Sequence, residues 1–299
     1  MSATRELYAL YSLLDDPQAS VQTAVRERIL SLGEEAVAGL RELTEFHGNL
    51  HQDVVGELVN DIRSTTALRR LDREFGGPEQ PVDLEESAFI LAKYGFPEIN
   101  TATYQRRLDD MAADVRVLAG SRATPLDTFM KMRSYLFSDL GFIGNREDYY
   151  NPHNSYINKV IDYRKGIPIT LSILLLTLGR RLGVSLNGIG MPMHFLVQYD
   201  DGSRMFFVDA FNSGIIITRD QCRLMLSSSG IRLTPEMLAP VSSRDIIERM
   251  WRNLYLAYQQ QGDEFEAARV AEILSFINPD FKVNNTLDDD PDEDEDEDF

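Results

Sequence analysis

Two side chains in the sequence are suited to joint acid–base chemistry. His194 opens one apolar stretch (HFLVQY) and Asp209 closes another (RMFFVD), and the turn sequence DDGS lies between them. An Asp-Gly pair between two such stretches favours a two-residue type I′ hairpin turn. With Asp201 and Gly202 as that turn, the register sets His194 directly opposite Asp209, on the same face of the hairpin.

A carboxylate beside an imidazole fixes the tautomer of the ring and favours its protonated form. Nucleophilic triads use these two groups as the base and its orienting acid. Two interpretations of the pair stay open at this point. It is either part of a catalytic triad or a structural His–Asp pair at the end of a strand.

A buried helix is predicted to lie beside these strands. The segment 168–182 (PITLSILLLTLGRRL) is apolar on nearly all sides, which is typical of a helix at the centre of a domain. Pro168 suits the first turn, where its missing N–H costs nothing, and Gly183 is a natural stop. Strands are predicted over 185–191, 194–199, 204–209 and 215–218.

The rest of the chain is predicted to be largely helical. Residues 1–75 resemble a HEAT-like segment, and 75–81 (FGGPEQP) form a linker. More helices follow over 84–140, and then 142–168 show little periodicity, which is typical of a long functional loop. Residues 243–282 resemble a tetratricopeptide-like pair. The tail 283–299 is predicted to be disordered, because ten of its last twelve residues are Asp or Glu.

Four longer motifs carry a family resemblance: GN-x3-YYNPHNS, RKGIPITLS, PMHFLV and FFVDAFNSG. An apolar helix, then a strand beginning with His and a strand ending with Asp, resembles the transglutaminase-like (papain-like) core. The motifs resemble its SirB-type branch, a bacterial branch whose core also occurs in an F-box protein. The resemblance covers roughly residues 83–226. It implies an α+β fold with a cysteine-protease-like core over 83–242.

In active enzymes of this superfamily, the resemblance implies, a nucleophilic Cys opens the central helix. Here that place reads Gly166-Ile167-Pro168, and proline has no nucleophilic atom. His194 and Asp209 match the other two triad positions. The sequence therefore lacks the nucleophile that would form a covalent intermediate.

Several hydroxyl and thiol groups are candidate substitutes. Ser155 precedes the helix and could reach the site. Thr170 lies about 200° round the helix from residue 168, and Ser172 is about one turn deeper. Cys222 follows the strands and is expected to be a small apolar filler.

The former active centre is also a candidate binding groove. Asn154 and Arg164 fall on motif positions, and Tyr149 and Tyr150 could line the groove. Arg164 could bind a carboxylate through two parallel hydrogen bonds. For each of these residues the alternative is loop anchoring or surface solvation.

The amino-acid composition argues against several classes of function. The net charge is −18, from 48 acidic and 30 basic residues, and without the ten acids of the tail it is −8. An acidic body argues against a nucleic-acid partner. The single cysteine excludes an intrachain disulfide. No secretory signal or membrane-length apolar run is found, so we expect a cytoplasmic protein without a membrane partner.

No cofactor is expected, because the sequence has neither a GxxxxGK[ST] nor a GxGxxG motif. His47 and His51 have a spacing that could hold a metal on a helix, but Gly48 and Asn49 between them favour a loop. We therefore expect no metal site.

The main hypothesis is a noncatalytic protein- or peptide-binding or regulatory protein. One alternative is an amide hydrolase or acyltransferase that uses Ser155 or another nucleophile. Another is scaffolding by the helical ends alone. The ligand and the oligomeric state stay open.

Overall fold

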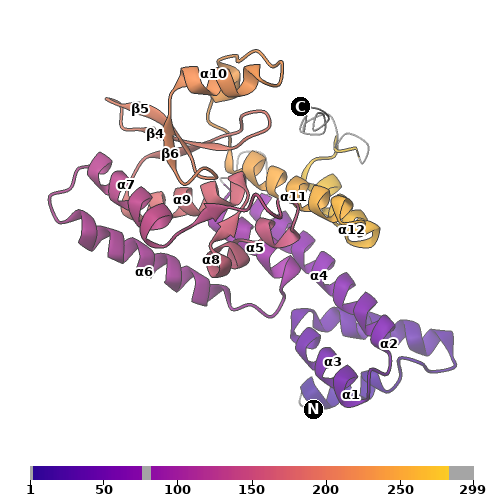
Figure 1. Ribbon diagram of the computed structural model, residues 1–299. Helices are drawn as coiled ribbons and strands as arrows, with labels where there is room; N and C mark the ends of the chain where they lie inside the picture. The colour runs from indigo at the N-terminus through magenta and orange to yellow at the C-terminus, as the bar shows by residue number, and fades with distance from the viewer. Residues whose placement is uncertain (1–2, 76–81, 283–299) are drawn as a thin grey trace. The chain divides into compact units, whose positions relative to one another are not determined.

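The computed structural model describes residues 3–75 and 82–282, and it divides into two compact units. The first contains residues 3–75 and 90–100, and the second contains residues 82–89 and 101–282. The division falls within helix α5 (Leu84–Gly95) (Figure 1). Each unit is described by itself.

The first unit contains four helices before α5. They are α1 (Ala3–Tyr11), α2 (Ala19–Leu32), α3 (Glu34–Phe46) and α4 (Gln52–Phe75). Gly33 separates α2 from α3 with a φ of 65°, a left-handed value that glycine adopts without strain. Buried apolar residues from all four helices share one core, among them Tyr11, Ile29, Leu40 and Leu58.

The second unit is built mostly from helices. They are α6 (Thr101–Ala119), α7 (Pro125–Ser134), α8 (Ile157–Tyr163), α9 (Pro168–Leu182), α10 (Arg219–Ser227), α11 (Ser243–Gln260) and α12 (Glu264–Ile277), with short turns η1 (Tyr135–Asp139), η2 (Pro152–Ser155) and η3 (Glu236–Leu238). Thr124 caps α7, and its hydroxyl accepts a hydrogen bond from the backbone of Asp127. Pro125 begins that helix, where its missing N–H costs nothing.

The predicted central helix is confirmed as α9. Every residue from Pro168 to Gly179 is buried, and Gly183 ends the helix with a φ of 68°. Thr170 ties the start of the helix to η2. Its hydroxyl oxygen accepts from the N–H of Ile167 at 3.2 Å and donates to the carbonyl of Asn154 at 2.8 Å.

Four antiparallel strands form a sheet in the order β3 (Leu186–Ile189), β4 (Leu196–Asp200), β5 (Met205–Asp209) and β6 (Ile215–Ile217). On one face, Leu196 and Phe207 pack with Cys222 of α10. On the other, the ring of Phe129 from α7 lies 5.2 Å from Tyr199. Helices together with this sheet confirm the predicted α+β class.

The predicted register of the hairpin is wrong by two residues. Asp200 pairs with Met205, so the loop contains four residues and not two. The side chain of Asp201 accepts hydrogen bonds from the backbone of Ser203 and Arg204 and stabilises the longer loop. The same ladder, continued, sets Asp209 opposite Leu196. Strand β4 also begins at Leu196 and not at His194.

The expectation that 142–168 are largely irregular is also wrong. This segment contains η2, α8 and a two-stranded parallel ladder of β1 (Ile143–Gly144) and β2 (Lys165–Gly166). The elements are too short to show a hydrophobic period. Helix α8 ends at Arg164, which adopts the left-handed conformation with a φ of 59°.

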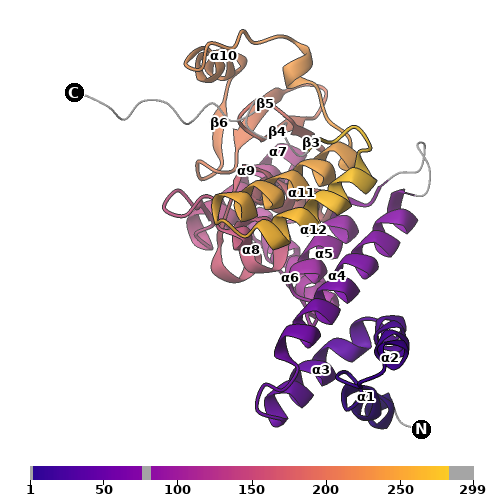
Figure 2. The same cartoon turned by 90° about the vertical axis from the view of Figure 1, so that its right-hand side faces the viewer.

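Helices α11 and α12 lie side by side (Figures 1 and 2). Gly262, with a φ of 73°, lies in the turn between them. The predicted linker residues 76–81 and the acidic tail 283–299 lie outside the described residues. Within residues 3–75 and 82–282, no helix has the length and apolar character needed to cross a bilayer.

Replacing Thr170 by valine tests the link between α9 and η2. The change keeps the shape of the side chain but leaves the Ile167 N–H and the Asn154 carbonyl without this partner. We expect the free energy of unfolding to fall by about 1–3 kcal/mol, measured by urea denaturation.

Thr177→Val is the matched control. Thr177 is buried in the same helix, but its hydroxyl donates only to the carbonyl of Leu174, one turn back. The free energy of unfolding should fall clearly less in this variant than in Thr170→Val. Equal losses for the two variants would contradict the role given to Thr170.

Candidate functional site

His194 and Asp209 lie in contact. Nε2 of His194 is 2.9 Å from Oδ2 of Asp209, and their side chains are 12% and 1% exposed. The error in the predicted register does not separate them, because a shift of two residues keeps each side chain on the same face of the sheet. The ladder, continued, sets Asp209 opposite Leu196, so His194 reaches Asp209 from two residues before β4 and is not its direct partner.

The contact is short but poorly aligned for a hydrogen bond. Although the atoms are close, Nε2 has no well-aligned hydrogen-bond acceptor among the described residues. The preceding Met193 has a φ of 60°, which costs a non-glycine residue about 1–2 kcal/mol. This backbone turn carries His194 out of the strand direction, just before β4 begins.

Asn212 binds both oxygens of the Asp209 carboxylate. Its backbone N–H donates to Oδ1 at 3.0 Å, and its side-chain amide donates to Oδ2 at 2.6 Å. The guanidinium of Arg146 in turn donates to the side-chain oxygen of Asn212. The sequence analysis did not identify Asn212 or Arg146. An Asp followed three residues later by Asn is a signal for such a side-chain-to-backbone turn.

These partners decide the charge of Asp209. Burial alone would raise the pKa of its carboxyl, but the close contact with His194 and the two hydrogen bonds from Asn212 outweigh burial and hold the pKa below its ordinary value of 3.8. Asp209 is therefore negative at neutral pH.

Aromatic rings surround the imidazole on one side. The ring of Phe211 lies edge-on to His194, with centroids 6.4 Å apart. Tyr149 lies 5.9 Å from Phe211, and Tyr150 lies 5.2 Å from Tyr149. The Arg146 guanidinium lies 5.1 Å from the centre of the Phe211 ring. The two predicted tyrosines therefore join the site through Phe211.

Asn154 is buried and supports the loop that carries Tyr149. Its side-chain amide donates to the carbonyls of Asp148 and Tyr149 at 2.7 and 2.9 Å, and its oxygen accepts from Asn145. All the groups of this amide are occupied by neighbouring backbone and side chain. The contacts are those of loop anchoring.

Arg164 is exposed and lies at the end of α8. Its guanidinium donates to the carbonyl of Leu140 at 2.8 Å, and its own carbonyl accepts from the N–H of Ile143. The described contacts of Arg164 thus hold β1 beside β2. None of them is with His194.

The candidate nucleophiles are all buried. Ser155 is 2% exposed in η2, and Thr170 and Ser172 are fully enclosed in α9. Cys222 is fully buried between α10 and the sheet, and burial raises the pKa of its thiol. Pro168 is buried in the first turn of α9. No hydrogen bond joins any of these side chains to His194 in the part of the chain described here.

His47 and His51 lie in the loop between α3 and α4, as predicted. The ring of His47 stacks on Tyr11 at 5.6 Å. Among the residues described, no group of three or more His, Cys, Asp or Glu side chains is placed to hold a metal ion.

Residues 102–252 match the family profile described as the transglutaminase-like superfamily. The chain belongs to this superfamily. The matched region begins in α6 and ends in α11, so it includes α9, the sheet and the His194–Asp209 pair. The predicted transglutaminase-like core is confirmed at this level.

Several curated proteins are similar in sequence to this chain. A UPF0162 protein of Xylella fastidiosa (strain Temecula1) is 29% identical over 204 residues, which are 65% of this chain and 71% of that protein. A UPF0162 protein of Vibrio cholerae is 28% identical over 216 residues, 71% of this chain and 78% of its own. Human F-box only protein 21 is 34% identical over 139 residues, 44% of this chain but 22% of that protein. No solved structure matches the chain.

Gly144→Ala tests whether β1 packs against Phe211, the ring beside His194. A Cβ at Gly144 would lie 2.4 Å from the Phe211 ring and 2.6 Å from its carbonyl oxygen. Because a backbone atom cannot move aside cheaply, we expect a loss of about 1–3 kcal/mol in the free energy of unfolding.

Gly56→Ala in α4 is the control, since a Cβ there meets open space. It should stabilise its helix by up to about 1 kcal/mol. A Gly144→Ala variant as stable as the unchanged protein would show that β1 does not pack on Phe211.

The lowered pKa of Asp209 predicts how stability depends on pH. The folded protein holds this proton less tightly than the unfolded chain, so acid favours unfolding. The contribution is complete above the unfolded pKa near 3.8 and is lost as the pH falls through the lower folded pKa.

Melting temperatures measured from pH 7 to pH 2 check this prediction. Asp209→Asn should be less stable at pH 7, and below about pH 4 its curve should fall less steeply than that of the unchanged protein. Two parallel curves would mean that Asp209 does not have a lowered pKa.

Proposed function

We propose that this chain is a noncatalytic protein- or peptide-binding or regulatory protein of the SirB-type branch. It uses a degenerate transglutaminase-like site for recognition. The observation that carries the proposal is Pro168 at the start of α9, buried and without a nucleophilic atom, at the position where the resemblance implies a catalytic cysteine.

The other reactive groups support the same conclusion. The hydroxyl of Thr170 is engaged with the backbone of Ile167 and Asn154. The Cys222 thiol is enclosed in the apolar layer under α10, and its raised pKa disfavours the thiolate that would attack a carbonyl. A thiol in that state is inert in acyl transfer.

The remaining groups are those of a binding site. Asp209 holds one side of the imidazole of His194 and keeps a negative charge beside it. The Nδ1 atom is left to bind a polar group of a peptide, such as a backbone carbonyl or a carboxylate when the ring is protonated. Tyr149, which is half-buried, supplies apolar surface for a side chain next to that group, and the buried ring of Phe211 lies behind it.

The helical parts add further surface in this proposal. Residues 1–75 serve as a HEAT-like segment and residues 243–282 as a tetratricopeptide-like pair, both of them types of helical repeat that bind proteins through extended surfaces. The core extends over 83–242. We also propose a cytoplasmic location for the protein, on the grounds of the sequence.

A second candidate is an amide hydrolase or acyltransferase with Ser155 as nucleophile. Its support is the position of Ser155, directly after Asn154, whose carbonyl is bonded to Thr170 in the first turn of α9. In this scheme Ser155 Oγ bonds to the acyl carbon, and its proton passes through His194 to the leaving amine. Water then releases the acid, or another amine takes the acyl group.

Electrophilic activity probes separate the two functions. The full chain is incubated with a fluorophosphonate or an iodoacetamide probe at neutral pH and its intact mass is measured. We expect no adduct at Ser155 and no release of amine from amide substrates. A Ser155 adduct that disappears in His194→Ala would reject the noncatalytic proposal.

Binding is tested with the same variant. Proteins retained by the tagged full chain are compared for the unchanged protein, His194→Ala and the control Val117→Ser, whose residue is 82% exposed on α6. The proposal expects partners that His194→Ala loses and the control keeps. Identical partner sets in all three would instead favour scaffolding by the helical ends alone.

A further inference from the structure

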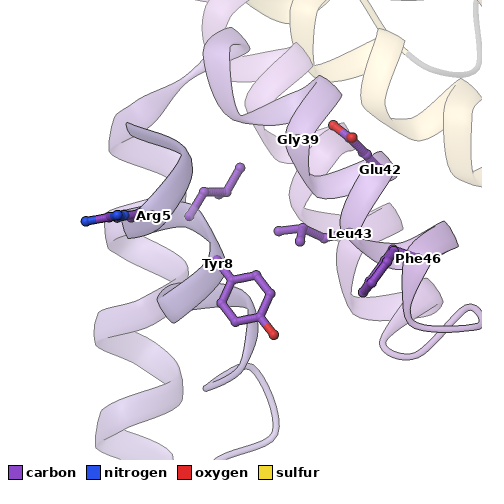
Figure 3. A pocket seen from close by; sticks show the side chains of 7 residues that line it. Arg5, Tyr8, Gly39, Glu42, Leu43 and Phe46 are labelled. Carbon is purple, nitrogen blue, oxygen red and sulfur yellow. The ribbon is translucent and has the colours of Figure 1, made fainter. Parts of the chain in front are cut away.

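A hollow of about 450 Å³ lies between α1 and α3 of the first unit (Figure 3). We call it the α1–α3 groove. Its lining residues are Arg5, Leu7, Tyr8, Gly39, Glu42, Leu43 and Phe46. All of them belong to one compact unit, so the groove does not depend on the placement of the other unit.

Gly39 allows the two helices to approach closely. A Cβ at this position would lie 2.5 Å from a methyl group of Leu7. Larger side chains on either side of this contact then form the walls of the groove, with Tyr8 on α1 and Phe46 on α3 (Figure 3).

These walls expose an unusual amount of apolar surface. Phe46 is 79% exposed and Tyr8 is 52% exposed. A single exposed apolar residue needs no explanation, but two large ones on facing walls of one hollow favour an interaction surface. Apolar side chains of a partner would gain by covering them.

The two walls carry opposite charges. Arg5 lies on α1 and Glu42 on α3, on the two sides of the groove (Figure 3). Both are exposed, and neither has an ion-pair partner among the described residues, although other charged residues of the unit do, such as Arg28 with Glu6 at 2.7 Å.

We propose that a second copy of this chain covers the α1–α3 groove. A two-fold rotation that sets α1 of one copy against α3 of the other joins the two apolar surfaces. The same rotation brings each Arg5 towards the Glu42 of the other copy. In a two-fold interface every contact occurs twice, so a groove with a cation on one wall and an anion on the other is its own complement.

The apolar and charged groups have different tasks in this dimer. Exposed ion pairs contribute little affinity, so burial of Phe46 and Tyr8 supplies most of it. The charges select the orientation, because the opposite arrangement of the helices would place Arg5 beside Arg5 and Glu42 beside Glu42.

Sedimentation velocity of the full chain over a concentration series tests the proposal. We expect a monomer–dimer equilibrium whose dissociation constant rises about tenfold or more in Phe46→Ser. Because Phe46 is 79% exposed, this variant should fold normally, as circular dichroism can verify. Val117→Ser, at an 82% exposed position on α6, should leave the dissociation constant unchanged.

A charge exchange tests the orientation. Arg5→Glu and Glu42→Arg should each weaken the dimer, and the double variant should recover most of the loss, because the two charges have changed places. A chain that stays monomeric at all concentrations overturns the proposal, including the case in which the groove receives a helix of another protein. So does a dimer that Phe46→Ser does not weaken, or a double variant weaker than either single one.

Discussion

The carboxylate of Asp209 is only 1% exposed, so hydrogen bonds within the protein must replace those it would make with water. Much of the site's arrangement follows from this need. Taking a charge out of water costs several kcal/mol unless hydrogen bonds and an opposite charge replace the solvent. Asn212 supplies two hydrogen bonds, and Nε2 of His194 lies 2.9 Å from Oδ2 of the same carboxylate. Since these residues come from the ends of two strands and the turn after them, satisfying one carboxylate fixes all three segments.

The second constraint acts at the start of α9. A proline there gives up an N–H that would have no helical partner and pre-sets the backbone for the first turn. Thr170 then links this turn to η2, and Asn154 links η2 to the loop of Tyr149. The start of α9 is therefore an anchoring point for the loop that carries the tyrosines.

The sequence predicts well those parts of the fold whose signals are long or chemically distinct. The all-round apolar character of α9, with Pro168 before it and Gly183 after it, is of this kind. The pairing of His194 with Asp209 is found even though the predicted register is wrong, because a four-residue loop shifts the strands by an even number and keeps the faces.

Other features could not be predicted because they depend on tertiary contacts. Helix α8 has seven residues, too few for a clear period, and its end at Arg164 is left-handed without a glycine. The contact of Arg146 with Asn212 joins side chains that are 66 residues apart and that only the folded chain brings together. The α1–α3 groove arises from the close approach of α1 to Gly39, which no pattern within either helix reveals.

The central claim is that the imidazole of His194 is held by Asp209 on one side and meets no nucleophile on the other. The nitrogen NMR spectrum of the four histidine rings tests it most directly. At neutral pH the Nε2 resonance of His194 should shift in Asp209→Asn, while both ring resonances should stay unchanged in Ser155→Ala and Cys222→Ser. A change at Nδ1 in either of the last two variants would place a hydroxyl or thiol against the ring and contradict the account.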